Sequence, residues 1–208
     1  MSGSPAAAWH RSGLCAGLAA AVLLAGCASS SGGSVLDKPM EWLGLKKPDV
    51  STMTPADLPQ LDRKVQLRIH AGERLNTDPA ARSLSIVVKV YKLKDVTAFL
   101  AAPLDAFKDS ASEKTAFGND LIDSRELVLT PGQKYEVVET LPPTIAQLAV
   151  VALFRAPAEG RWRFAFGTRA AEKSGITLGV HACAMSVAAG EPLDTAPELL
   201  RLAGVQCR

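Results

Sequence analysis

The sequence lacks a strong charge of either sign. Its 208 residues carry 23 Lys and Arg against 21 Asp and Glu, which gives a formal net charge of +2. Removal of the leader described below takes away one basic residue, Arg11, and no acid, so the charge falls to +1. Nucleic-acid binding needs a large basic excess or a clustered basic stripe, so we expect no nucleic-acid partner. Hydrophobic residues at 48% and charged residues at 21% are ordinary for a globular protein and argue against disorder throughout.

The sequence also lacks the motifs of catalysis. It contains no Gly-x-Ser-x-Gly elbow, phosphate-binding glycine loop or Cys-x-x-Cys pair. His10 lies in the leader, and His70 and His181 fall among alternating polar positions that are typical of a strand surface or edge. His181 and Cys183 supply half of a metal site, but the sequence has no second such pair nearby. The acidic residues fall mostly where turns and solvent faces are expected, so we predict no enzyme, no metal and no cofactor other than a covalent lipid.

The apolar run near the N-terminus is too short to cross a membrane. It extends over the twelve residues 14–25, whereas a spanning helix needs about 20. It has the size of a signal-peptide core, preceded by the basic pair at 10–11. It ends in Leu24, Ala25, Gly26 and Cys27, which resembles the lipobox of bacterial lipoproteins. We therefore predict a lipoprotein signal peptide over residues 1–26 and acylation of the nucleophilic thiol of Cys27. The alternative is an ordinary secretory leader in which Cys27 is accidental.

The resemblance to lipoproteins implies a permanent attachment and a destination. Lipoproteins of this kind carry acyl chains on the cysteine sulfur and on its freed amine. Two or more chains hold a protein stably at a membrane, at about 0.8 kcal/mol per buried CH₂. Residue 28 is Ala and not the Asp of an inner-membrane retention signal, so we expect sorting to the outer membrane, on its periplasmic face. Residues 27–62, with a Gly/Ser spacer and several prolines, are predicted to be a flexible tether, and residues 63–208 the folded domain.

The body of the chain shows the two-residue period of half-buried strands. In residues 64–71, for example, Val65, Leu67 and Ile69 alternate with polar residues. Residues 95–119 break this rhythm with short helical pieces, one capped by Asp95, one over Leu104–Phe107 and one capped by Ser112. We predict a mainly all-β fold, a β-sandwich of seven to eight strands with a helical insertion at about 95–119. The expected strands are residues 64–71, 85–93, 125–129, 134–138, 148–154, 161–166 and 176–187, the last being one long strand or two joined by a bulge.

Four cysteines divide by location. Cys15 lies in the leader and Cys27 is the predicted acylation site, which leaves Cys183 and Cys207. In a compartment that permits oxidation, we expect these two to form a disulfide that stabilises the domain by roughly 3–4 kcal/mol. The period of the last strand places Cys183 on its outer face, where a C-terminal tail would cross it. The alternative is a pair of free thiols.

Four arginines gather around one expected hairpin: Arg155, Arg161, Arg163 and Arg169. We interpret them as a solvated basic face. The alternative is a surface for an acidic protein partner or a lipid headgroup.

Several short segments, in their order and spacing, resemble the TssJ (VasD) family of lipoproteins of the bacterial type VI secretion system. The similarity extends over about residues 64–187 behind the lipobox. The residues that carry it are Leu75-Asn76 with Pro79, Val88-Lys89-Val90-Tyr91-Lys92-Leu93-Lys94-Asp95 with Phe99, Leu127-x-Leu129-x-Pro131-Gly132, Val150-Val151-Ala152-Leu153-Phe154-Arg155, and Trp162-Arg163.

This resemblance implies a fold, a role and a site. The fold is a transthyretin-like β-sandwich with a short helical addition. The role is that of an outer-membrane anchor, which binds the periplasmic C-terminal region of TssM, an inner-membrane component, and forms the trans-envelope complex with TssM and TssL. The loop joining the first two strands, associated with TssM binding in the family, maps to residues 72–83. The candidate partner-binding residues in it are Arg74, Leu75, Asn76, Asp78 and Arg82.

Two other functions remain open at this point. One is a different envelope assembly lipoprotein, such as a pilotin-like chaperone, which would bind a secretin or barrel protein. The other is a small-ligand-binding lipoprotein, which would need a sizeable apolar pocket inside the sandwich. Expected tight packing of Val65, Val88, Val150 and Trp162 argues for a closed core instead.

Overall fold

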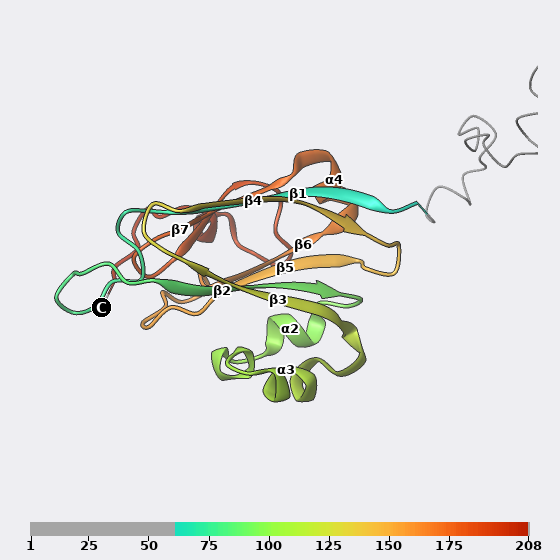
Figure 1. Ribbon diagram of the computed structural model, residues 1–208, viewed down its shortest axis with the longest axis horizontal. Helices are drawn as coiled ribbons and strands as arrows, with labels where there is room; N and C mark the ends of the chain where they lie inside the picture. The colour runs from blue at the N-terminus through green and yellow to red at the C-terminus, as the bar shows by residue number, and fades with distance from the viewer. Residues whose placement is uncertain (1–60, 208) are drawn as a thin grey trace, which may run out of the picture. The chain divides into compact units, whose positions relative to one another are not determined.

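Two four-stranded sheets form the framework of the chain's described part (Figure 1). The computed structural model describes residues 61–207; the predicted signal peptide, the lipobox with Cys27 and the tether up to residue 60 lie outside them. The sheet orders are β4-β1-β7-β8 and β3-β2-β5-β6, and the predicted mainly-β sandwich is confirmed. The strands are β1 Arg63–Ala71, β2 Ile86–Leu93, β3 Leu121–Leu129, β4 Lys134–Leu141, β5 Gln147–Ala152, β6 Arg163–Gly167, β7 Ile176–Val180 and β8 Met185–Ala189.

The core between the sheets follows from side-chain alternation. In β1, Val65, Leu67 and Ile69 are fully buried, as their two-residue period predicts. In β5, Leu148 and Val150 face this same core, while the residues between them face the other way. Those residues are also buried, because a second layer covers the outer face of the β5 sheet. This two-sided burial explains why β5 is a continuous apolar run.

The second layer is the helical insertion, composed of α2 Thr97–Ala101, η3 Leu104–Phe107, α3 Ser110–Phe117 and η4 Gly118–Asp120. It lies against the outer face of the β3-β2-β5-β6 sheet (Figure 1). Phe99, Phe107 and Phe117 pack around Tyr91 of β2, with ring centroids 5.2 to 6.1 Å apart. Edge-to-face pairs of this kind add about 0.5–1.5 kcal/mol each beyond the buried area. The insertion therefore has an aromatic core of its own.

The caps of the insertion differ in one detail from the prediction. The side chain of Asp109, and not Ser112, caps α3, because its Oδ1 accepts from the amides of Ala111 (3.0 Å) and Ser112 (2.9 Å). The Asp95 carboxylate accepts from the amide of Thr97 (2.8 Å), at the start of α2. The expected piece at Leu104–Phe107 is present as η3.

The prediction for residues 176–187, one long strand or two joined by a bulge, is wrong in its connection: two strands are present, but a turn joins them. The chain reverses at residues 181–184, where the amide of His181 donates to the carbonyl oxygen of Ala184 (2.9 Å), so β7 and β8 form an antiparallel hairpin. Cys183 consequently lies in the turn and is 3% exposed, not on the outer face of a strand. The strand period cannot reveal such a turn, because His181, Ala182, Cys183 and Ala184 include no glycine, proline, asparagine or aspartate to mark it.

A helix that the sequence analysis did not predict, α4 Thr168–Ser174, carries the chain from one sheet to the other. It ends at Gly175, which adopts a φ of +66° and lies against the backbone of Gln66 in β1. A glycine fits there because it has no Cβ. The run Ala170-Ala171-Glu172-Lys173 before a glycine was the available signal for this helix.

The predicted solvated face of four arginines is wrong for two of them. The guanidinium of Arg163 stacks on the ring of Trp162 at 4.5 Å and donates to the carbonyl oxygens of Phe99 (3.1 Å), Leu100 and Ala102. Arg163 therefore donates hydrogen bonds to carbonyl oxygens at the C-terminal end of α2 and links the insertion to β6. Arg161 donates to backbone carbonyl oxygens of the C-terminal segment, whereas Arg155 and Arg169 are exposed.

Replacing Arg163 with lysine tests this attachment. Lysine keeps the charge but loses the planar fork that reaches three carbonyl oxygens, so we expect Arg163→Lys to lower the free energy of unfolding by about 2 kcal/mol. Arg169→Lys, on the exposed face of α4, is the matched control and is expected to change it by less than about 0.5 kcal/mol. Urea denaturation measures both, and equal values for the two variants would contradict the role of Arg163.

Candidate functional site

The β1–β2 loop, residues 72–85, lies at one end of the sandwich, beside the turn at 181–184 (Figure 1). The amide of Gly72 donates to the carbonyl oxygen of Val180 (2.8 Å). The amides of Asn76 and Thr77 donate to the carbonyl oxygens of His181 and Ala182, both at 3.0 Å. These bonds tie the loop to the turn along its first half.

Two of the predicted partner-binding residues in this loop face the interior. Leu75 is fully buried in the sandwich core, and Asn76 is 8% exposed. The Asn76 side chain donates to the carbonyl oxygen of Ser85 (3.0 Å) and accepts from the amide of Arg155 (2.9 Å), while its backbone adopts a φ of 43°. Leu75 and Asn76 therefore set the shape of the loop, and the surface it presents to a partner belongs to its other residues.

The second half of the loop is closed by Asp78 and Arg82. The carboxylate of Asp78 accepts from the Arg82 amide (2.9 Å) and from two nitrogens of its guanidinium (both 2.7 Å). Hydrogen bonds from the amide and guanidinium of Arg82 hold the pKa of Asp78 below its usual value. Arg74 is exposed, as are residues 79–81 at the tip, and the Arg82 side chain is 78% exposed. The loop thus presents charged side chains on a backbone that is already ordered.

His181 behaves as a structural histidine. Its ring lies over Gly179, and Nε2 is 3.0 Å from the hydroxyl of Ser186. Burial lowers the pKa of His181, so the ring is uncharged at neutral pH. Within residues 61–207, no three His, Cys, Asp or Glu side chains are grouped so that they could hold a metal ion. His70 contacts Glu136 at 3.3 Å on the outer face of β1, as an exposed strand residue.

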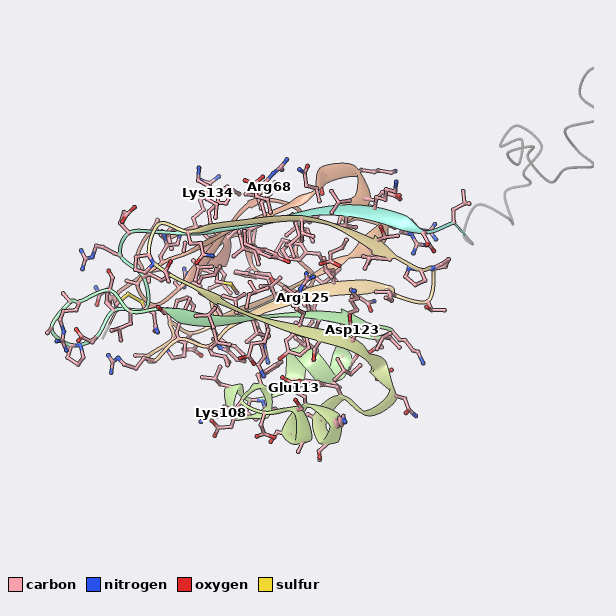
Figure 2. All side chains as sticks on the ribbon, in the orientation of Figure 1. Arg68, Lys108, Glu113, Asp123, Arg125 and Lys134 are labelled. Atoms are coloured by element: carbon pink, nitrogen blue, oxygen red, sulfur yellow. A yellow bond between two sulfur atoms is a disulfide. The ribbon has the colours of Figure 1, made fainter. Side chains whose placement is uncertain are left out.

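A buried polar cluster was not predicted from the sequence, because the acidic residues were expected mostly in turns and on solvent-exposed faces. Glu113 of α3 is 2% exposed and lies between the insertion and the sheet (Figure 2). Its Oε1 accepts from Lys89 Nζ (2.8 Å) and from the Tyr91 hydroxyl (2.7 Å). Burial and the bond to Glu113 raise the pKa of Tyr91, so the hydroxyl stays protonated and donates. Because these groups satisfy one another, the cluster fastens α3 to β2 and leaves no free acid or base.

A second buried acid joins the two sheets. Glu139 of β4 is 5% exposed and pairs with Arg125 of β3 and with Lys92 of β2 (3.5 Å). Arg125 also lies over the ring of Tyr135, 5.6 Å from its centroid. β3 and β4 are the edge strands of their sheets, so this group closes the edge at which they meet.

Cys183 and Cys207 form a disulfide bond, with their Cα atoms 5.6 Å apart. It draws the C-terminus to the same end of the molecule as the β1–β2 loop (Figure 1). A surface hollow of about 560 Å³ lies between α2 and the C-terminal segment, lined by Leu100, Trp162 and Leu199 among others. Val65, Val88 and Val150 are fully buried between the sheets as expected, whereas Trp162 is only partly buried and lines this outer hollow. Of the helices in residues 61–207, none is long and apolar enough to cross a membrane.

Replacing Asn76 tests whether its side chain shapes the loop. Asn76→Ala removes both hydrogen bonds and leaves at positive φ a residue that tolerates this conformation less well than asparagine, so we expect a loss of about 2–3 kcal/mol in the free energy of unfolding. Asn76→Gly removes the same hydrogen bonds but tolerates the backbone conformation, and should lose less. Chemical denaturation of both variants measures the order, and a glycine variant less stable than the alanine variant would refute the conformational part.

A family model described as "Type VI secretion lipoprotein, VasD, EvfM, TssJ, VC_A0113" matches residues 63–183. No curated protein matches the sequence. Among solved structures, the type VI secretion lipoprotein TssJ1 from Pseudomonas aeruginosa is 27% identical with a TM-score of 0.56, and the match covers 62% of this chain and 98% of that one.

Two further structures contain a similar chain. One is described as the TssM C-terminal domain of the type VI secretion system from EAEC; the match has 26% identity and a TM-score of 0.50, and covers 60% of this chain and 97% of that one. The other is described as a type VI membrane complex, with 26% identity, a TM-score of 0.54 and the same coverages. The family is a structural component of the secretion system and not an enzyme, in agreement with the lack of catalytic motifs. With a family match over more than half of its length and the sandwich described above, this chain belongs to the type VI secretion lipoprotein family of TssJ and VasD.

Proposed function

We propose that this chain is an outer-membrane-anchored periplasmic lipoprotein that binds the periplasmic C-terminal region of TssM and, through that complex, acts with TssL. The observation that carries the proposal is that chains matched over nearly their whole length come from structures described as the TssM C-terminal domain and a type VI membrane complex. A partner common to the family is the simplest reason for such a chain to occur there. The role requires binding and anchoring, and no chemistry.

The anchor in this proposal is the acylated Cys27. Residues 1–26 are removed as a lipoprotein signal peptide, Cys27 carries the lipid, and residues 27–62 tether the domain at 63–208. Support comes from the lipobox sequence Leu24-Ala25-Gly26-Cys27 and from membership of a lipoprotein family. Ala28 after the cysteine favours the outer membrane.

The β1–β2 loop is the proposed TssM-binding element. The chain enters the domain at Arg63, and the loop follows the other end of β1 (Figure 1). The nine residues of β1 hold these two points about 30 Å apart, so the loop lies at the end of β1 opposite to the one where the tether enters the domain. Arg74 and Arg82 supply the charged surface. The Asp78 side chain, 9% exposed, holds Arg82 in place, and Leu75 and Asn76 fix the backbone beneath. A loop ordered before binding loses less conformational entropy on association.

Replacing Cys27 with serine tests the anchor. We expect Cys27→Ser to yield a soluble periplasmic protein that still binds TssM but does not support secretion, because no acyl chain holds it at the membrane. Fractionation and an effector-secretion assay measure the two effects. Cys15→Ser, in the discarded leader, is the matched control and should behave as wild type. Normal secretion by Cys27→Ser, or mass spectrometry showing an unmodified thiol at Cys27 in wild type, would contradict anchoring.

Reversing a charge on the loop tests the binding surface. Arg74→Glu should weaken binding of the TssM periplasmic region about tenfold, chiefly at low salt, because a charge at an interface acts on association through electrostatic attraction. Arg169→Glu, on α4, introduces the same charge change outside the loop and should leave binding unchanged. Biolayer interferometry across a salt series gives both values. Equal affinity of Arg74→Glu and wild type would contradict a role of Arg74 in the interface. If wild type does not bind TssM at micromolar concentration, the pilotin-like alternative is favoured.

A further inference from the structure

The turn at residues 181–184 is the junction of three segments that are distant in sequence. Its carbonyl oxygens at His181 and Ala182 accept from the first half of the β1–β2 loop. The carbonyl oxygen of Cys183 accepts from the amide of Ala158 in the β5–β6 connection (2.8 Å). The disulfide then joins the same turn to the C-terminus at Cys207. The turn therefore supplies two of the backbone bonds that hold the first half of the β1–β2 loop in place.

The segment that the disulfide closes contributes little to the core. We call residues 191–207 the C-terminal strap. Within these described residues Pro192 is the only buried one, and residues 201–204 are exposed. Its middle is held by Arg161, whose guanidinium donates to the carbonyl oxygens of Glu198 (2.9 Å) and Arg201 (3.4 Å). The hairpin of β7 and β8 is paired by its own ladder, without the strap. The strap adds one backbone bond to β6, from the amide of Leu193 to the carbonyl oxygen of Ala165 (2.8 Å), and packs Leu200 against the core, while the two four-stranded sheets are paired without it.

We propose that the Cys183–Cys207 disulfide is a positioning element for partner binding: by fixing the turn at 181–184, it holds the β1–β2 loop in its binding conformation. This inference rests on the proposed function, since the loop is the proposed TssM-binding element. All four carbonyl oxygens of the turn accept backbone hydrogen bonds, two of them from the loop, and the crosslink adds a covalent link from this junction to the C-terminus. With the disulfide open, the turn and the loop fluctuate together, and the partner has to order both when it binds.

Replacing Cys207 with serine opens the disulfide at its exposed end and leaves the buried Cys183 in place. We use the full lipidated chain in detergent micelles, with the periplasmic C-terminal region of TssM as the ligand. In Cys207→Ser, hydrogen exchange should become faster at the amides of Asn76 and Thr77, which donate to the turn, and stay slow at Leu67 and Val88 in the core strands. The dissociation constant should rise about fivefold to tenfold, because the ordering cost moves into the binding step.

Two controls isolate the disulfide from the strap. Wild type treated with a dithiol reductant should reproduce both effects, and Cys207→Ser should not respond to the reductant. Arg161→Met frees the middle of the strap but keeps the crosslink, and should leave exchange at Asn76 and Thr77 unchanged.

Three outcomes overturn the inference. The first is wild-type affinity in Cys207→Ser. The second is a lower melting temperature for Cys207→Ser, while the affinity and the loop's hydrogen exchange, measured well below that temperature, are unchanged. The disulfide would then contribute to stability alone. The third is weaker binding without faster exchange, which would mean that the strap itself contacts the partner. If oxidised wild type does not bind TssM, the proposed function fails, while the exchange measurement still decides whether the disulfide braces the loop.

Discussion

Burial of β2, β5 and β6 on both faces of their sheet is the constraint on which the rest of the domain depends. One face of β5 packs through Leu148 and Val150 into the core between the sheets, and the other packs through Ala149 and Val151 against the helical insertion. A half-buried sheet would tolerate polar residues on its outer face, but this one requires a cover. The insertion is therefore an integral third layer, and its aromatic cluster is as much a core as that of the sandwich.

Covering the sheet with helices buries polar groups, and the structure satisfies them in two places. Glu113 binds Lys89 and Tyr91, and Arg163 binds carbonyl oxygens at the end of α2. Paired and hydrogen-bonded charges of this kind fix one orientation of a packed layer, since any other leaves a charge without a partner. The insertion is thereby held in one orientation on the sheet. At the other site, backbone hydrogen bonds and a disulfide hold the β1–β2 loop and the turn at 181–184.

The sequence by itself determined the elements whose cause is local. Alternation in β1, the all-apolar run of β5, the helical break after residue 94 and the piece at Leu104–Phe107 are all written in the spacing of side chains. The family is likewise readable from short segments in order. The pairing of Cys183 with Cys207 followed from counting, because the other two cysteines are assigned to the leader and the lipobox.

Only the tertiary structure decided what depends on distant partners. Asn76 belongs to the interior because its side chain accepts from Arg155, 79 residues away, and no local pattern contains that contact. In the sequence, Arg163 cannot be told from three neighbouring arginines. In the fold, carbonyl oxygens at the end of α2 lie beside its guanidinium and accept from it. The reversal at 181–184 likewise depends on which strand β8 pairs with. Spacing along the chain records which side chains face water or core, whereas the choice of hydrogen-bond partner is made only when segments meet in space.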